Sequence, residues 1–480
     1  MKYLWLLVLP GCAQLFGLDD TTGPTSDAPG PGAHVTLQHE SIGATVVDAP
    51  ADNTTVTFHV PDGAGGFQQV PATLESRGVW NGDIPDGVNP MVDFTVDGVR
   101  RLWAFPTRDL HAVSALLEHP DPQPAPSPAS LTLDVSVDLT NGTESFVLYT
   151  VGAWSVQGLA NPGMASALTQ VVDYQMSTPI GGPLAKLTTA DDVLIFRRRL
   201  DIASNTSPLD GVFQTTLDQT GADTLTGALN TTAVDKTINA SVNPSTLATR
   251  YTAVRPAVAG LAMGMAVIAS PGFARGDVNG PTLNDHGIAM TDTLVTLPYG
   301  NPFASLGWNE LVYFNSYETR AVTVTGAMTA LGLAAGEQTF TTPGANLTVD
   351  LPAGLPVTIS LGTTLLASDN TTVPLDTTKY AHITMVNDRP SATFVSAQVY
   401  EVTVDTMGVP SVKFVIEAAA SDPAALVLPP NVLAVGHMYV ILAITHVGGY
   451  PNLATGDLAT TAPPLHVAYN YSGVFTVENP

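Results

Sequence analysis

The chain has 480 residues, of which 45% are hydrophobic and 12% are charged, and its 42 Asp and Glu against 17 Lys and Arg give a formal net charge of −25. The hydrophobic share excludes wholesale disorder, and the scarcity of cations argues against nucleic-acid binding, which needs a positive surface. At roughly 150 residues per domain, this length suggests about three domains.

The first residues have the organisation of an export signal. In MKYLWLLVLPGC (1–12), Lys2 precedes a seven-residue apolar run, Tyr3–Leu9. A helix that crosses a bilayer needs about 20 apolar residues, so this run is too short to span one. The segment therefore predicts export rather than a transmembrane anchor.

The end of this segment resembles the lipobox of bacterial lipoproteins. Leu9 lies three positions before Cys12, and the small Gly11 directly precedes it, although Pro10 stands where Ala, Ser, Thr or Val is usual. The resemblance implies removal of residues 1–11 as a signal peptide and fatty acylation of the Cys12 thiol. An ordinary secretory signal peptide is the alternative interpretation.

Cys12 is the one cysteine of the chain, so no intramolecular disulfide can form and the fold must depend on packing. Residues 12–33 continue with a stretch rich in Gly, Pro, Thr, Ser and Asp, which we interpret as a flexible tether behind the lipid anchor. The residue after Cys12 is Ala13 rather than Asp. By the sorting rule of Gram-negative lipoproteins, this favours the outer membrane or cell surface, with the periplasmic face as the alternative.

The next segments alternate between apolar and polar residues, which is typical of half-buried strands. Residues 34–108 predict a small β-sandwich, because short alternating runs are separated by turn clusters such as NGDIPDG (81–87). We expect a short helix over 109–119, since apolar residues recur there at helical spacing. The proline-rich 120–130 predicts a stiff linker.

Residues 131–352 predict a β-rich central region of one or two domains. LTLDVSVDLTNGTESFVLYTVGAW (131–154) favours two strands joined by an Asn-Gly hairpin turn. The 13-residue apolar run at 257–269 is short for a membrane span and predicts a buried strand or core helix. The whole chain is thus expected to be all-β, built of multi-domain antiparallel β-sandwiches.

Residues 353–480 carry the clearest domain signal. In VLAVGHMYVILAIT (432–445), Leu433, Gly436 and Tyr439 are spaced as before strand F of fibronectin type III and Ig-like domains, which the segment resembles. The resemblance implies a β-sandwich in which the Tyr439 hydroxyl bonds to backbone just upstream. The segments 393–405, 411–418 and 466–478 are expected to be strands of this domain.

The densest aromatic segment is LPYGNPFASLGWNELVYFNSYE (297–318). Exposed rings bind sugars and peptides because they bury area at low entropic cost. Trp308, Tyr299 and Tyr313 are therefore the candidate ligand-binding residues, for a protein or glycan ligand. The alternative is that these rings fill a sandwich core.

No catalytic motif occurs in the sequence, and its ten histidines are scattered, so we predict no catalytic residues, no metal site and no cofactor. Two fragments faintly resemble calcium loops, GDVNG (276–280) and VNDRP (386–390). We expect a surface or periplasmic lipoprotein, attached to the membrane by its lipid anchor, with a binding or structural role and no enzymatic activity. A hydrolase on a β-scaffold and a calcium-dependent adhesin are the alternatives.

Overall fold

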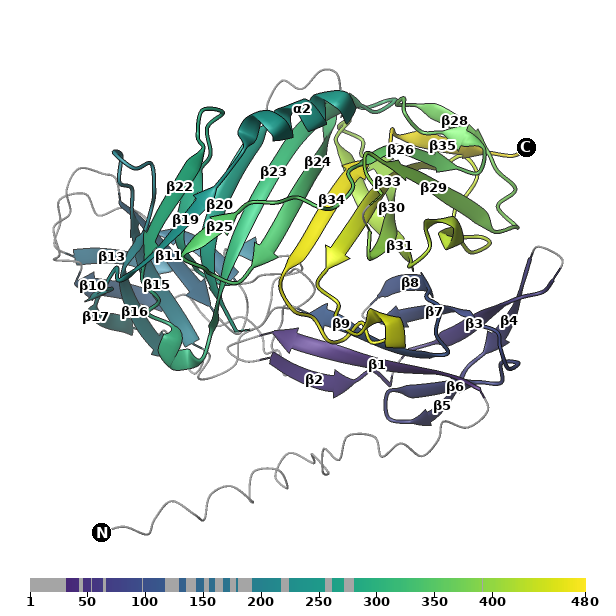
Figure 1. Cartoon of the computed structure of the whole chain (residues 1–480), viewed down its shortest axis with the longest axis horizontal. Coiled ribbons are helices and arrows are strands. Elements are labelled where there is room, and N and C mark those ends of the chain that lie inside the picture. The colour runs from purple at the N-terminus through teal and green to yellow at the C-terminus, as the bar shows by residue number, and fades with distance from the viewer. Residues whose placement is uncertain are drawn as a thin grey trace, which may run out of the picture.

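The computed structural model describes residues 32–42, 46–52, 54–63, 66–96, 98–116, 129–134, 144–150, 155–159, 167–172, 178–179, 192–216, 224–254, 261–271, 280–390 and 392–480. These residues are almost entirely β-strand, which confirms the predicted all-β class (Figure 1). An α-helix, α2 (Pro244–Val254), and the 3₁₀ turns η2 (Ala304–Leu306), η3 (Pro423–Ala425) and η4 (Leu453–Thr455) interrupt the strands. The predicted signal peptide and most of the predicted tether lie outside the described residues.

One large sheet of 14 strands organises the molecule. Its hydrogen-bonded order is β21 (Thr282–Gly287), β20 (Ala262–Ser270), β23 (Asn309–Thr323), β24 (Ala330–Thr341), β34 (Leu465–Tyr471), β33 (Met438–Gly448), β30 (Phe394–Val404), β31 (Pro410–Ala420), β8 (Val99–Ala104), β7 (Met91–Val96), β3 (Val56–Pro61) and β4 (Phe67–Pro71). Two further strands, β28 (Thr371–Pro374) and β35 (Phe475–Glu478), pair beside β33. Strands from all three predicted domain regions therefore share one hydrogen-bonded sheet.

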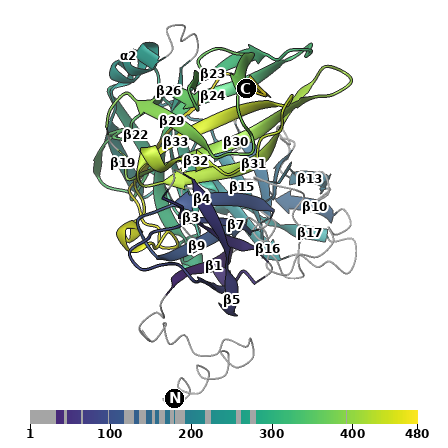
Figure 2. The same cartoon turned by 90° about the vertical axis from the view of Figure 1, so that its right-hand side faces the viewer.

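The first strands of the chain form a sandwich with the β8 end of the large sheet. A second sheet contains β2 (Val46–Pro50), β1 (Ala33–Ile42), β6 (Val79–Gly82) and β5 (Thr73–Ser76), with β9 (Asp109–Leu116) parallel to β1. Apolar side chains of this sheet, including Leu37 and Trp80, pack against Phe58 and Phe94 of the large sheet. Figure 2 shows this unit beneath the C-terminal strands.

The prediction of a helix over 109–119 was wrong, because residues 109–116 form strand β9. Leu110 and Ala112 alternate into the core, and the backbone of β9 pairs with β1 from His34↔Asp109 onward. Apolar residues at helical spacing can also present every second residue to a sheet, so tertiary pairing decided the conformation.

The central region forms three smaller sheets. These contain β13 (Ala167–Val172), β10 (Ala129–Asp134) and β17 (Thr224–Ala228); β14 (Thr178–Pro179), β12 (Ser155–Leu159), β11 (Glu144–Thr150), β15 (Asp192–Arg199), β16 (Leu209–Thr216) and β18 (Asn230–Thr231); and β22 (Leu294–Tyr299), β19 (Lys236–Ser241) and β25 (Asn346–Thr348). The described strands on either side of the expected Asn-Gly turn, β10 and β11, lie in different sheets and do not pair with each other, and the turn itself lies outside the described residues. The apolar run 257–269 contributes β20, so the strand interpretation was correct.

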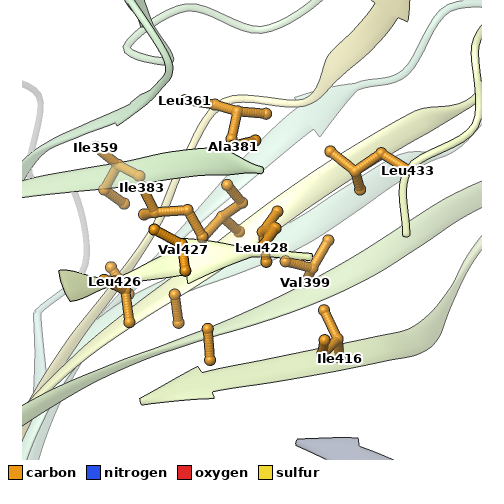
Figure 3. Close-up of a cluster of buried hydrophobic side chains, with 14 of the residues drawn as sticks. Ile359, Leu361, Ala381, Ile383, Val399, Ile416, Leu426, Val427, Leu428 and Leu433 are labelled. Atoms are coloured by element: carbon orange, nitrogen blue, oxygen red, sulfur yellow. The ribbon is translucent and has the colours of Figure 1, made fainter. Parts of the chain in front are cut away.

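A further sheet packs over the C-terminal half of the large sheet. It contains β27 (Thr364–Leu365), β26 (Pro356–Leu361), β29 (Ala381–Asn387) and β32 (Val427–Leu428). Ile359 and Ile383 meet Val399 and Ile416 in a buried cluster (Figure 3). This arrangement is a sandwich.

The expected tyrosine corner is present in this sandwich. The Ala434 N–H donates to the Tyr439 hydroxyl at 2.8 Å, as the resemblance to Ig-like domains implied. The segments 393–405 and 411–418 form β30 and β31, whereas 466–478 divides into β34 and β35. This C-terminal sandwich does not stand alone, since β34 also pairs with β24.

Helix α2 is fastened across the face of the large sheet by a buried charged cluster. The Arg250 guanidinium, which is 8% exposed, binds the carboxylates of Glu337 and Asp388 and donates to the Leu351 and Ala353 carbonyls. Burial raises the pKa of Glu337 to about 7 despite this cation. The helix is thus positioned by charge pairing as well as by apolar packing.

Side chains alternate between the two faces of each strand, so the large sheet has two distinct surfaces. On β30, Val395, Ala397 and Val399 face the C-terminal sandwich core. Ser396 and Gln398 point to the opposite face, which we call the pocket face. It extends over β24, β34, β33, β30, β31 and β8, and its β8 end meets the core of the N-terminal sandwich.

Candidate ligand-binding pocket

Two of the three aromatic residues singled out from the sequence are core residues. Trp308 and Tyr299 are 4% and 3% exposed, in one apolar cluster with Phe303, whose ring centroid lies 5.4 Å from that of Trp308. The Tyr299 hydroxyl donates to Glu310 at 2.8 Å. These two rings offer no free face to a ligand, so the core alternative holds for them.

Tyr313 lies on the opposite surface of β23, on the pocket face. It stands directly across from Phe340 of β24, with the ring centroids 5.0 Å apart. Burial raises the pKa of the Tyr313 phenol, although hydrogen bonds with Asn315 and Gln338 offset part of this effect. Phe340 and Gln338 both line a cavity, so Tyr313 is the sequence candidate that borders a pocket.

This cavity, of about 280 Å³, lies on the pocket face where the N-terminal sandwich meets the C-terminal strands. It draws residues from β8, β24, β30, β31, β33 and β34, and from the loop that joins β33 to β34 and contains Tyr450 and Leu458. The loop is held against β9, because the Leu458 N–H donates to the His111 carbonyl at 2.9 Å. Its polar lining includes Arg101, Gln338, Ser396, Gln398, Glu417 and His446.

The cavity contains one charge of each sign. Arg101 and Glu417 stand opposite each other on the parallel strands β8 and β31, and Arg101 Nε donates to Glu417 Oε2 at 3.2 Å. Their side chains are 12% and 20% exposed, so solvent screens the pair only in part. The two charges compensate each other within the pocket.

His446 adds an uncharged imidazole. Burial lowers the pKa of His446 to about 3, so the ring is neutral at physiological pH. The ring stacks on Phe394 at 4.1 Å with an interplanar angle of 9°, and its Nε2 lies 3.3 Å from the Ser396 hydroxyl. The other nitrogen, Nδ1, is buried and has no hydrogen-bond partner among the described residues.

Two more residues of the lining carry a buried nitrogen atom in the same condition. Within the part of the chain that the structure describes, Arg101 Nη1 and Trp103 Nε1 also have no hydrogen-bond partner. Most buried polar atoms of proteins are hydrogen-bonded, and an unsatisfied one costs about 1–3 kcal/mol. Three residues that line a single cavity therefore each carry a buried polar nitrogen without a partner among the described residues.

The other sites predicted from the sequence either lie outside the described residues or have carboxylates that are already paired. Cys12 and most of GDVNG (276–280) lie outside them. In VNDRP (386–390), the Asp388 carboxylate is bound by Arg250. Among the described residues, no group of three or more His, Cys, Asp or Glu side chains could hold a metal ion, and no helix is long and apolar enough to cross a membrane.

Sequence reasoning did not find this pocket. Ser396 and Gln398 alternate with apolar residues, a signal for a strand with one polar face, but nothing local shows which distant strands share that face.

Comparison with known proteins places this chain in no family. No family model and no curated protein matches it. Among solved structures, it aligns with Escherichia coli alpha-2-macroglobulin activated by porcine elastase, at 9% identity and a TM-score of 0.14. The alignment covers 94% of this chain and 44% of that one. A likeness this low supports no conclusion about fold or function.

Proposed function

We propose that the chain is an exported lipoprotein without catalytic activity that binds a small polar ligand in the cavity of the pocket face. One observation carries the binding part of this proposal: Arg101, Trp103 and His446, which line a single cavity of the described residues, each have a buried nitrogen atom without a hydrogen-bond partner there. A ligand that supplied partners would remove a cost of about 1–3 kcal/mol for each atom.

Binding is favoured over hydrolysis by the surroundings of the Ser396–His446 pair. A serine nucleophile needs a base whose second nitrogen is oriented by a third group, commonly a carboxylate. His446 Nδ1 has no such partner among the described residues. We therefore assign the imidazole to ligand contact.

The proposed location rests on the lipobox-like MKYLWLLVLPGC (1–12). Acyl chains on Cys12 would hold the protein at the outer membrane or cell surface, because each buried methylene contributes about 0.8 kcal/mol and two chains anchor stably. Intact-mass measurement of protein from the native host tests this directly. A chain that begins at Cys12 and carries acyl mass is expected; an unmodified Cys12 contradicts the anchor.

Binding is tested by thermal unfolding of the soluble chain against four probe classes: neutral sugars, D-glucuronate, L-glutamate and L-lysine, and uridine. A ligand of the folded state raises the melting temperature. Ala419 is 2% exposed and lies between Ser396 and Trp103 in register, so Ala419→Leu should fill the cavity and abolish the shift. Ala321→Leu, on an exposed position of β23, is the matched control.

At least one probe should stabilise the wild type and the control but not Ala419→Leu. If Ala419→Leu does not fold, Gln338→Ala replaces it, since this amide also lines the cavity. No shift with any probe, or turnover of p-nitrophenyl esters or glycosides by the wild type, contradicts the proposed function.

A further inference from the structure

We infer that the ligand of this pocket is a neutral sugar, recognised one pyranose ring at a time. The inference rests on the proposed function, because it names the ligand class of the same cavity. It follows from three properties of the described lining: its charge, its hydrogen-bonding groups and its shape.

The charge of the lining favours an uncharged ligand. Arg101 and Glu417 compensate each other, and the imidazole of His446 is neutral because its pKa is lowered to about 3, so neither an anion nor a cation meets a net opposite charge. A ligand carboxylate would bind a guanidinium best through two parallel hydrogen bonds. Arg101 Nε is already engaged by Glu417, and the chain as a whole carries −25, which further disfavours an anion.

The hydrogen-bonding groups call for a ligand that both donates and accepts. Arg101 Nη1 and Trp103 Nε1 can only donate, whereas the Glu417 carboxylate can only accept. The amides of Gln338 and Gln398 do both. Hydroxyl groups match this mixture because each donates one hydrogen bond and accepts two. An apolar guest would leave the two buried N–H groups unpaired.

The shape of the cavity suits a flat ring. Its volume of about 280 Å³ lies just below the roughly 300–1,000 Å³ of small-molecule sites, and Phe340, Phe394 and Tyr450 contribute aromatic walls. The apolar C–H face of a pyranose packs on such rings while its rim of hydroxyls reaches the polar lining. A single ring therefore fits better than a long chain.

Tyrosines continue this surface beyond the cavity. Tyr313 stacks beside Phe340, and Tyr469 of β34 stands directly across from Gly336. A Cβ atom at position 336 would lie 2.4 Å from the Tyr469 hydroxyl, so the glycine leaves room for the phenol to lie over the sheet. With Tyr317, which is 40% exposed and also opposite Gly336, these rings form a second place where a linked sugar could rest.

Isothermal titration of the soluble chain with D-glucose, D-galactose, N-acetyl-D-glucosamine, D-glucuronate and L-glutamate tests the inference. A neutral sugar should bind, and Gln338→Ala and Trp103→Phe should each weaken it about five-fold or more, since each removes a hydrogen-bonding group. Gln68→Ala, an exposed amide on β4, is the matched control and should change affinity less than two-fold. Because Trp103 also packs on Phe94, melting curves must show that Trp103→Phe is folded; Gln338→Ala keeps the test valid if it is not.

The two proposals fail in different ways. Binding of D-glucuronate or L-glutamate without any neutral sugar would overturn the sugar assignment and leave a binding pocket. Binding of a neutral sugar that both pocket variants leave unchanged would also overturn it, because the sugar would then bind elsewhere. No binding of any probe class contradicts the proposed function as well.

Discussion

Replacing His446 with Phe should make the stability of the protein less sensitive to acid. The imidazole stacks on Phe394, and burial lowers the pKa of His446 from 6.5 to about 3. Between these two values the unfolded chain binds a proton that the folded chain does not. The free energy of unfolding therefore falls as the pH drops below 6.5, and the variant lacks this loss.

The size of the effect follows from the two pKa values. At pH 7 the imidazole is mostly neutral in both states, whereas at pH 5 it is almost fully protonated in the unfolded chain alone. Linkage at 1.36 kcal/mol per pKa unit gives a loss of about 2 kcal/mol between pH 7 and pH 5. Glu337, with its pKa raised to about 7, contributes the opposite slope, because its stabilisation is lost as the pH rises through 7. Only the difference between variant and wild type isolates His446.

Urea denaturation of both proteins at pH 7 and pH 5 measures this difference. On going from pH 7 to pH 5, the free energy of unfolding of His446→Phe should rise by about 2 kcal/mol relative to that of the wild type, whatever the stability of the variant at pH 7. His446→Gln removes the same titrating ring with a different shape and should show the same gain. If the free energies of unfolding of variant and wild type differ by the same amount at both pH values, the lowered pKa of His446 is refuted.

Three substitutions, with Tyr317→Ala as a control, test the packing and the charge pairing. Trp308→Ala should lower the free energy of unfolding by about 3–5 kcal/mol in urea denaturation, whereas Tyr317→Ala, on a half-exposed ring, should cost less than about 1 kcal/mol; equal losses would contradict the burial of Trp308. Tyr439→Phe should cost about 1 kcal/mol by leaving the Ala434 N–H without its acceptor, and an unchanged melting temperature would argue against the tyrosine corner. Arg250→Met should cost about 3–5 kcal/mol, because Glu337 and Asp388 would remain as buried carboxylates without their cation, and a neutral outcome in urea would show that α2 is held by apolar contacts alone.

The sequence predicted those features of the fold that depend on local patterns. Alternating apolar residues indicated strands, and they are strands in β1, β3, β30 and β31. The spacing of Gly436 and Tyr439 predicted a hydrogen bond that spans only five residues, from Ala434 to Tyr439. Such features need no knowledge of distant partners.

Features that depend on pairing over long separations were missed. Strand β9 is fixed by β1, whose residue His34 pairs with Asp109. The partners of strands β10 and β11 cannot be read from an Asn-Gly turn signal alone. Trp308 and Tyr313 are five positions apart in an aromatic segment, yet one lies in the core and the other on the pocket face. Composition marks such a segment as important without giving the side to which each ring points.

The pocket illustrates the same limit for function. Arg101 meets Glu417 across 316 positions of sequence, and Ser396 meets His446 across 50. Neither pair has a spacing that a motif search would recognise. Their proximity is a product of the sheet order, in which β8 joins β31 and β30 joins β33.

A crystal structure of the protein soaked with the neutral sugar that gives the strongest titration tests the central claim most directly. A pyranose ring should occupy the cavity, with hydroxyl oxygens about 2.7–3.2 Å from Arg101 Nη1 and Trp103 Nε1. A cavity that stays free of sugar, with both nitrogen atoms bonded to the protein itself, would contradict it.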